Sequence, residues 1–162
     1  MLFRSGLKDA LEAQALVQEV AAAAQDRAHK HISHIVTKCL GAVFLKEAYQ
    51  FKIHFDRKRG KTDARLVFVD AAGNEMDPAE EDSGGAVDVA AFGLRLACLL
   101  LAKPAGRRVL LLDEPFRMVS KDHTERLRKL VLGVSKEFKV QVIMITHNQE
   151  LACGSVVRVS KT

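Results

Sequence analysis

The sequence predicts an α/β lobe with parallel strands, preceded by one long helix. Two apolar runs, residues 108–112 and 140–146, are separated by a segment whose apolar residues have helical spacing. Strands joined by a crossover helix lie parallel in one sheet, and runs this apolar are expected to be covered on both faces. Before them come a proline-free segment typical of a helix and an alternating segment typical of a β-hairpin. We therefore expect a helical lead-in at residues 1–40 and one lobe at residues 41–162.

Residues 6–39 predict the long helix. They lack proline, are rich in Ala, Leu, Gln, Glu and Lys, and carry apolar residues at spacings of three and four or their sums. The resulting stripe is thin and alanine-heavy, with Leu7, Ala10, Val17, Ala21, Ala24, Ala28 and Ile35. Such a stripe is typical of the end of a coiled coil, and a helix packed on its own domain has a similar one.

The β-hairpin is predicted from two alternating segments, YQFKIHF at residues 49–55 and ARLVFV at residues 64–69. Between them DRKRGKTD forms a basic tip. Residues 71–74 have turn chemistry, and residues 77–82 form an acidic, helix-breaking connector.

The rest of the lobe alternates helices with strands. Residues 87–102 predict a buried helix that ends at Lys103 and Pro104, and residues 122–138 predict the crossover helix between the two apolar strands. A short helix from Gln149 and a last strand at residues 156–159 are expected to complete the unit.

Composition limits the classes of protein. The length of 162 residues suits about one domain, and 48% hydrophobic residues suffice for a core. No apolar stretch reaches the roughly 18 residues of a membrane span, and the first residues lack a secretory signal, so we expect a cytoplasmic protein. The three cysteines are scattered and odd in number, which is typical of reduced, packed thiols rather than disulfides or metal ligands.

The net charge of +5 is concentrated in three basic clusters, at residues 57–61, 103–108 and 126–129. A polyanion such as DNA suits these clusters, and so does a solvated turn or helix face. For Arg57, Lys58, Arg59 and Lys61, four positive charges in five residues beside Phe55, we predict contact with DNA.

An adjacent acidic pair follows the first apolar strand, in VLLLDEP at residues 109–115. Ligands of open parallel sheets bind at the carboxyl ends of the strands. There Asp113 could hold Mg²⁺, directly or through water, and Glu114 could polarise the water that attacks a γ-phosphate. An ordinary strand end followed by an acidic turn has the same pattern.

A histidine follows the second apolar strand, in ITHN at residues 145–148. If the two strands are parallel, His147 lies at the same edge of the sheet as Glu114. A histidine there can contact a γ-phosphate and orient the attacking water, although a lone histidine in a turn is more often a surface residue.

The triplet Ser83-Gly84-Gly85 opens the predicted buried helix. Glycines at a helix start leave backbone N–H groups open to a phosphate, and the serine hydroxyl adds a donor. A serine N-cap followed by flexible glycines is the alternative interpretation.

In chain order, Ser83-Gly84-Gly85 with its helix, then LLLDEP, then THN resemble the signature motif, Walker B motif and switch histidine of the ABC ATPase superfamily. The resemblance covers about residues 82–160. The chain is more similar to the SMC and double-strand-break-repair ATPases than to transporters, because a coiled-coil-like helix and a β-hairpin precede the signature. The segments VDVAAFGLRLACLLL and RVLLLDEPFRMVS are especially similar to the corresponding sequences of phage and bacterial SMC-like repair ATPases.

This resemblance implies the C-terminal lobe of a P-loop NTPase head that uses ATP and Mg²⁺. Ser83, Gly84 and Gly85 would touch ATP held by a second head, whereas Asp113, Glu114 and His147 would serve the ATP of their own head. The implied partners are an N-terminal Walker A lobe, the second ATPase head, DNA and a nuclease subunit, with no membrane.

Three positions depart from the pattern of this superfamily. Asp82 and Ala86 replace the usual Leu before and Gln or Glu after the signature. The aspartate expected in the loop after Walker B, the D-loop, is replaced by Ser120 or displaced to Asp122. These departures affect the signature contact and the communication between two ATP sites.

A GxxxxGK[ST] loop following a strand is missing from the sequence. Without its cradle of N–H groups and its lysine, a triphosphate loses most of its binding contacts. We therefore expect a C-terminal lobe, encoded separately or truncated upstream, that hydrolyses ATP when a Walker A lobe completes it. The alternative is a non-catalytic module that binds an SMC-like partner or DNA. Apolar surface is expected to be exposed where the missing half would pack.

Overall fold

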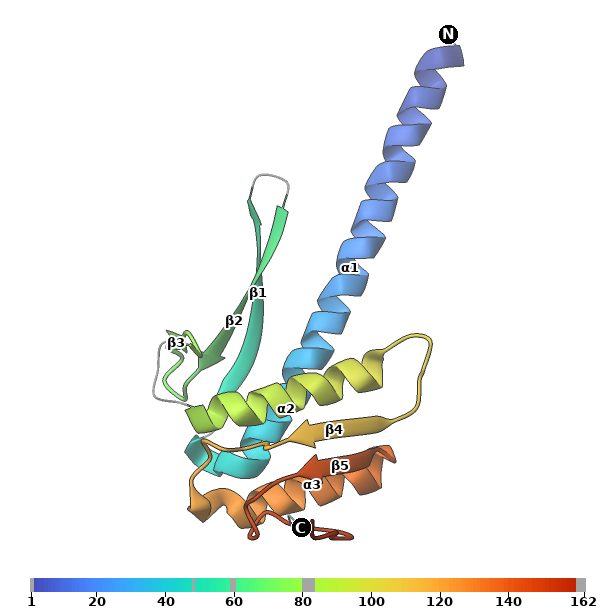
Figure 1. Ribbon diagram of the computed structural model, residues 1–162. Coiled ribbons are helices and arrows are strands. Elements are labelled where there is room, and N and C mark those ends of the chain that lie inside the picture. The colour runs from blue at the N-terminus through green and yellow to red at the C-terminus, as the bar shows by residue number, and fades with distance from the viewer. Residues whose placement is uncertain (1, 48, 59–60, 80–83, 160–162) are drawn as a thin grey trace. The chain divides into compact units, whose positions relative to one another are not determined.

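The computed structural model describes residues 2–47, 49–58, 61–79 and 84–159 (Figure 1). The chain divides into two compact units, Met1–His31 and Ile32–Thr162. The side chains of residues 2–7, 46, 56–58 and 61–62 also lie outside the description. Ser83, which was predicted to belong to a signature motif, and Arg59, which was predicted to contact DNA, therefore lie outside the described residues.

The first helix, α1 (Leu2–Phe44), confirms the predicted long helix and extends it at both ends. Within the first unit none of the side chains described from residue 8 to residue 31 is buried, and Leu11, Leu16, Val17 and Val20 are more than half exposed. From Ile32 onward α1 belongs to the second unit, where Val36, Cys39, Leu40 and Val43 are buried.

A β-hairpin follows a 3-10 turn at Leu45–Glu47. Strand β1 (Gln50–Lys58) pairs antiparallel with β2 (Lys61–Val69), from Gln50 opposite Val69 to Lys58 opposite Lys61. The hairpin is confirmed, but its strands continue into the segment that was expected to form the tip. It extends away from the rest of the second unit in Figure 1. A two-residue strand that the sequence did not indicate, β3 (Glu75–Met76), pairs with β2.

Two parallel strands form the second sheet. Strand β4 (Val109–Asp113) pairs in register with β5 (Gln141–Ile145), so that Asp113 lies opposite Ile145. The crossover consists of a 3-10 turn, η2 (Lys121–His123), and helix α3 (Thr124–Phe138). The predicted order of strand, helix and parallel strand is therefore confirmed.

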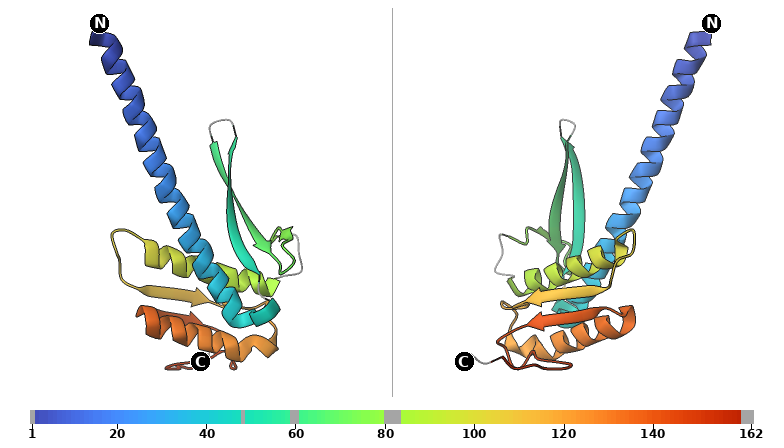
Figure 2. Two further views of the ribbon diagram at one scale, coloured as in Figure 1. Left: turned by 180° about the vertical axis from the view of Figure 1, so that it is seen from behind. Right: turned by 45° about the vertical axis from the view of Figure 1, so that its right-hand side comes forward.

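The core lies on one face of this sheet. Leu110 and Leu112 of β4 are buried in the same cluster as the end of α1, helix α2 (Gly84–Leu101) and α3. The left-hand view of Figure 2 shows these helices around the two strands. Within the cluster Phe92 of α2 packs against Phe116, with ring centroids 5.4 Å apart. Among the described helices only α2 is long and apolar enough to cross a membrane, a criterion that core helices also meet, and seven of its residues are buried.

The opposite face of the parallel sheet is open, so the prediction that both faces are covered is wrong for the described chain. Leu111, Ile143 and Ile145 are 69%, 46% and 65% exposed. Successive side chains of a strand point to opposite faces, and the helices cover the face that carries Leu110 and Leu112. The open face agrees with the expectation of exposed apolar surface.

Two terminal elements were also predicted wrongly. Residues 149–151 form a turn rather than a helix, and residues 156–159 form no strand. Val156, Val157 and Val159 are exposed, because this run has no neighbouring strand to pair with in the described structure.

Candidate nucleotide site

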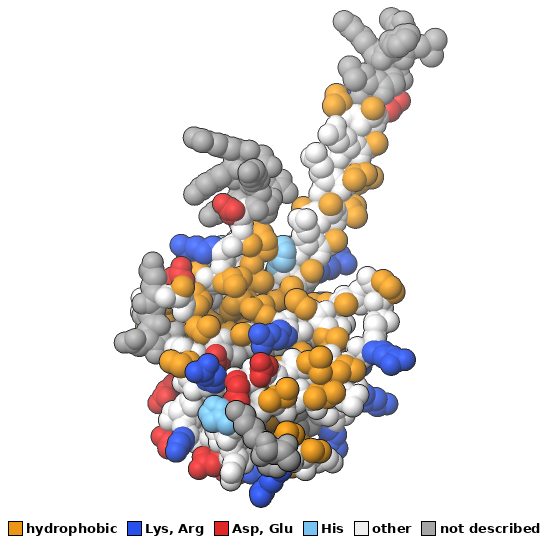
Figure 3. Space-filling model, in the orientation of Figure 1, with side chains coloured by type: hydrophobic (Ala, Val, Ile, Leu, Met, Phe, Trp, Pro, Cys, Tyr) orange, Lys and Arg blue, Asp and Glu red, His pale blue; other side chains and the backbone are white. Residues whose placement is uncertain are grey.

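The acidic pair and the histidine lie at one edge of the parallel sheet. Asp113 is the last residue of β4 and Glu114 follows it, while Thr146 and His147 follow β5. Because the two strands are parallel and in register, their carboxyl ends meet. Figure 3 shows acidic side chains beside a histidine on the face of the molecule that carries these strands.

Glu114 and His147 are in direct contact. The Nδ1 atom of His147 lies 2.7 Å from Oε2 of Glu114, and the backbone N–H of His147 donates to Oε1 at 3.0 Å. The hydroxyl of Thr146 also donates to Oε2, at 3.4 Å. The Glu114 side chain is 31% exposed and that of His147 79% exposed, so the pair is accessible to a ligand.

The backbone at Glu114 is held in an uncommon conformation. Its φ angle is +42°, and that of Phe116 is +63°, in a region that residues other than glycine rarely occupy. The N–H of Glu114 donates to the carbonyl of Ile145 at 2.9 Å, and the Phe116 ring is buried against Phe92. These two contacts fix the sharp turn that directs Glu114 toward His147.

The hydrogen bond from the His147 side chain is the main reason why the pKa of Glu114 is lowered. The backbone N–H of His147 and the Thr146 hydroxyl act in the same direction, whereas desolvation opposes them. Each donor stabilises the carboxylate relative to the carboxylic acid. Glu114 is thus a hydrogen-bond acceptor at neutral pH, able to orient a water molecule, but a weak base.

Asp113 is exposed at the end of β4 and supplies one carboxylate. The described residues contain no group of three or more His, Cys, Asp or Glu side chains that could hold a metal ion by themselves. Mg²⁺ usually binds proteins through one or two carboxylates and completes its shell with substrate phosphates and water. Asp113 therefore suits a Mg²⁺ site that it shares with a nucleotide.

The start of α2 packs closely against the loop that follows β4. A Cβ atom on Gly84 would come within 3.1 Å of the Met118 Cβ, and one on Gly85 within 3.1 Å of the Met118 carbonyl oxygen. The sequence left two explanations for these glycines open, access for a phosphate and flexibility after a serine N-cap. The structure adds a packing reason, because a backbone carbonyl cannot move aside cheaply.

Asp88, one turn further along α2, was missed in the sequence. Its Oδ2 accepts the backbone N–H of Met118 at 2.9 Å. The one signal in the sequence that could have indicated a role for Asp88 is its carboxylate, which stands in the otherwise apolar start of a helix. The two residues are thirty positions apart, however, so only the fold brings them together.

The basic residues at the hairpin end lie at the ends of the two strands. Arg57 pairs in register with Thr62, and Lys58 with Lys61. Arg59 lies outside the described residues. Because Lys61 and Thr62 begin a strand, the triplet Gly60-Lys61-Thr62 does not lead into a helix as the end of a phosphate-binding loop does.

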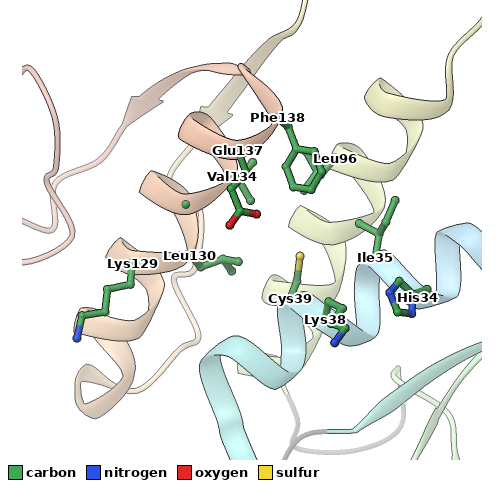
Figure 4. Close-up of a pocket in the computed structure, with 11 residues that line it drawn as sticks. His34, Ile35, Lys38, Cys39, Leu96, Lys129, Leu130, Val134, Glu137 and Phe138 are labelled. Carbon is green, nitrogen blue, oxygen red and sulfur yellow. The ribbon is translucent and has the colours of Figure 1, made fainter.

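An apolar groove of about 360 Å³ lies elsewhere in the second unit, between the end of α1, α2 and α3 (Figure 4). None of the predicted site residues lines it. Its walls are formed by His34, Ile35, Lys38, Cys39, Leu96, Lys129, Leu130, Gly133, Val134, Glu137 and Phe138.

No protein-family model matches the sequence, and no curated protein matches it significantly. Solved structures do. The SMC head domain from Thermotoga maritima aligns with a TM-score of 0.53 and 18% identity, covering 77% of this chain and 40% of that chain.

Two archaeal structures are similar over more of the sequence. The Smc head domain with a coiled coil and joint from Pyrococcus yayanosii aligns with a TM-score of 0.61 and 16% identity, covering 85% of this chain and 26% of that one. The Smc head domain from Pyrococcus furiosus, bound to the C-terminal domain of ScpA, aligns with a TM-score of 0.57 and 16% identity. This alignment covers 85% of this chain and 35% of that one.

This chain thus spans between about a quarter and two fifths of the length of these three structures. At these identities the similarity concerns the fold. The alignments cover 77% to 85% of this chain, which therefore has the fold of part of an SMC head domain.

Proposed function

We propose that the chain is the lobe of an SMC-like DNA repair or recombination ATPase that supplies the residues for ATP cleavage, while an N-terminal lobe supplies the Walker A loop. The observation that carries this proposal is the contact between Glu114 and His147 at the carboxyl ends of two parallel strands. Open parallel sheets bind their ligands at this edge.

The proposed roles follow from the chemistry of each side chain. Glu114, deprotonated at neutral pH, accepts a hydrogen bond from the attacking water and orients it toward the γ-phosphate. His147, the more exposed of the two, contacts the phosphate with a ring N–H and holds Glu114 in position.

Asp113 is the proposed Mg²⁺ ligand and would hold the ion directly or through water at this edge of the sheet, beside the phosphates of the nucleotide. When bound, Mg²⁺ neutralises charge that develops on the phosphates. In the chain itself Asp113 is exposed beside Glu114, so the carboxylate is available for this role.

The open face of the parallel sheet supports the need for a second lobe. Leu111, Ile143 and Ile145 expose apolar side chains next to the proposed site. A contiguous apolar surface of this kind typically marks a protein interface. We propose that the Walker A lobe covers this face and thereby brings its phosphate-binding loop to Asp113 and Glu114.

A second head is the other proposed partner. One similar structure belongs to an SMC ATPase with ATP-driven dimerization and DNA-stimulated activation. In this chain Ser83, Gly84 and Gly85 are the residues proposed to reach the ATP of the second head. A nuclease subunit remains a further candidate partner, and the expected location is the cytoplasm.

The decisive experiment measures ATP turnover by the lobe joined to its Walker A lobe, with Glu114→Gln and Glu150→Gln as matched variants. Both substitutions replace one carboxylate by an amide, at Glu114 after β4 and at Glu150 in the turn after β5. Glu150 is exposed, and its side chain has no ion pair with the residues that the structure describes. We expect Glu114→Gln to lower kcat by about 100-fold or more and Glu150→Gln to leave it unchanged. Unchanged turnover in Glu114→Gln would remove the proposed role of Glu114.

A non-catalytic interaction module is the alternative function. It is favoured by the packing of Gly84 and Gly85 against Met118, since this contact explains both glycines without a nucleotide. This alternative predicts no ATP turnover even when a Walker A lobe is supplied, together with stable binding between the two lobes.

For the end of the hairpin we propose contact with DNA. Arg57, Lys58 and Lys61 lie at the ends of β1 and β2 that the connection of the hairpin joins, and Arg59 follows Lys58 in the sequence. Basic side chains at the end of a long two-stranded ribbon can follow phosphates without distorting the ATPase lobe. Such a contact weakens steeply as the salt concentration rises.

A further inference from the structure

The segment that follows the acidic pair, residues 116–119, is fastened to one side of α2. Gly84 and Gly85 pack on Met118 and Val119, Asp88 accepts the N–H of Met118, and Phe92 packs on Phe116. Residues 84, 88 and 92 are spaced by four and therefore lie on the same side of the helix.

These contacts differ in kind. The packing of glycine and phenylalanine sets how closely the segment approaches α2, but neither contact is directional. The hydrogen bond from Met118 N to Asp88 Oδ2, at 2.9 Å, is the one contact among them that fixes the orientation of the backbone. Met118 itself is 70% exposed, so the burial of its side chain does not hold it.

The two polar residues that follow this segment, Ser120 and Asp122, make a weaker contact with each other. The Ser120 hydroxyl donates to Oδ2 of Asp122 at 3.5 Å. Both residues are exposed. The carboxylate that holds the loop backbone therefore comes from α2, across thirty positions of sequence, and not from the loop.

We propose that Asp88 is a positioning residue that orients the 116–119 segment against the start of α2. This inference rests on the proposed function, because both the start of α2 and this segment would then face the second head. Asp88 touches no nucleotide in this proposal. It acts through Met118, and it keeps the strained turn at Glu114 and Phe116 attached to the helix that begins with the signature glycines.

The test compares Asp88→Ala, Asp88→Asn and Asp122→Ala in the full chain by amide hydrogen exchange at Met118. Loss of a hydrogen bond to a charged acceptor is expected to speed exchange at Met118 by about tenfold or more in Asp88→Ala. Asp88→Asn keeps a neutral acceptor of the same size, so its exchange rate should fall between wild type and Asp88→Ala. Asp122→Ala removes the alternative loop carboxylate and should leave Met118 exchange unchanged.

The amides of β4 serve as an internal reference, since they report opening of the whole lobe. Equal exchange at Met118 in wild type and Asp88→Asn would overturn the proposal, even if Asp88→Ala failed to fold. An acceleration in Asp122→Ala as large as that in the Asp88 variants would overturn it as well.

The second readout is ATP turnover by the completed head. We expect Asp88→Ala to lower kcat about tenfold with KM for ATP unchanged, and Asp88→Asn to restore part of it. Faster exchange with normal kcat would reduce Asp88 to a structural contact and overturn its positioning role. If the wild-type head hydrolyses no ATP, the proposed function fails, and the exchange rates still decide whether Asp88 orients the segment.

Discussion

Replacing Gly93 by alanine is expected to destabilise the second unit, although alanine is the better helix former. A Cβ atom at position 93 would lie 3.0 Å from the Cα of Val36 and 3.5 Å from the Cβ of Cys39, both on α1. The first of these is a backbone atom in a buried part of α1, so the two helices must separate to admit the methyl group. Overpacking of this kind costs about 1–3 kcal/mol.

Gly133→Ala provides the matched control. Gly133 lies in the middle of α3, and a Cβ atom there would meet nothing within 4 Å. Alanine stabilises a helix interior relative to glycine by about 1 kcal/mol at both positions. The difference between the two variants therefore isolates the steric cost, about 1–3 kcal/mol.

The free energy of unfolding of both variants is measured by urea denaturation, followed by circular dichroism of the helices. Gly133→Ala should raise the free energy of unfolding above that of wild type. The free energy of unfolding of Gly93→Ala should be lower than that of Gly133→Ala by the steric cost. Equal stabilisation of both variants would show that α1 and α2 do not approach each other as closely at Gly93 as the structure has them.

Three further predictions concern charge and reactivity. Because His147 lowers the pKa of Glu114, that carboxylate stabilises the folded chain above the ordinary glutamate pKa of 4.5, and this contribution is lost as the pH falls through the lower folded-state pKa. Urea midpoints of wild type and Glu114→Gln should therefore converge between about pH 6 and about pH 3, whereas a constant difference would contradict the contact. Burial raises the pKa of Cys39 to about 12, so iodoacetamide should modify the exposed Cys98 before Cys39. Mass spectrometry of peptides measures the labelling of each thiol, and comparable labelling of both would refute this order. Reversing Arg57 and Lys58 to glutamate should weaken DNA binding and lower the slope of log K against log salt by about 2, while an unchanged slope would exclude these side chains as phosphate contacts.

Local patterns were sufficient to predict the long helix, the hairpin, the buried helix and the parallel pair, but not β3 or the end of the chain. The long helix, the hairpin and the parallel pair each have a periodicity that extends over the whole element. Strand β3 has only two residues, Glu75 and Met76, which is too short for any periodicity to be visible.

The same patterns could not show which faces of the parallel sheet are covered. An apolar run such as Val109–Asp113 is equally compatible with burial on one face and on two, because exposed Leu111 looks like buried Leu110 in sequence. An apolar surface left open for a partner has the same sequence pattern as a buried one, so the sequence predicted more burial than the described structure has.

The proximity of Glu114 and His147 could be predicted because the carboxyl ends of parallel neighbours always meet at one edge. The sequence could not predict the hydrogen bonds between these two residues or the positive φ angles of Glu114 and Phe116. Both depend on how residues 114–119 turn back onto α2. Asp88 was missed for the same reason. The roles of Asp113, Glu114 and His147 in ATP cleavage stay predictions.

The most direct measurement is a crystal structure of the lobe joined to its Walker A lobe, with Mg²⁺ and a non-hydrolysable ATP analogue. We expect the terminal phosphate to lie beside Glu114 and His147, with Asp113 facing the metal ion. A triphosphate bound away from this edge of the sheet, or a sheet edge occupied by a protein partner in its place, would contradict the proposed nucleotide site.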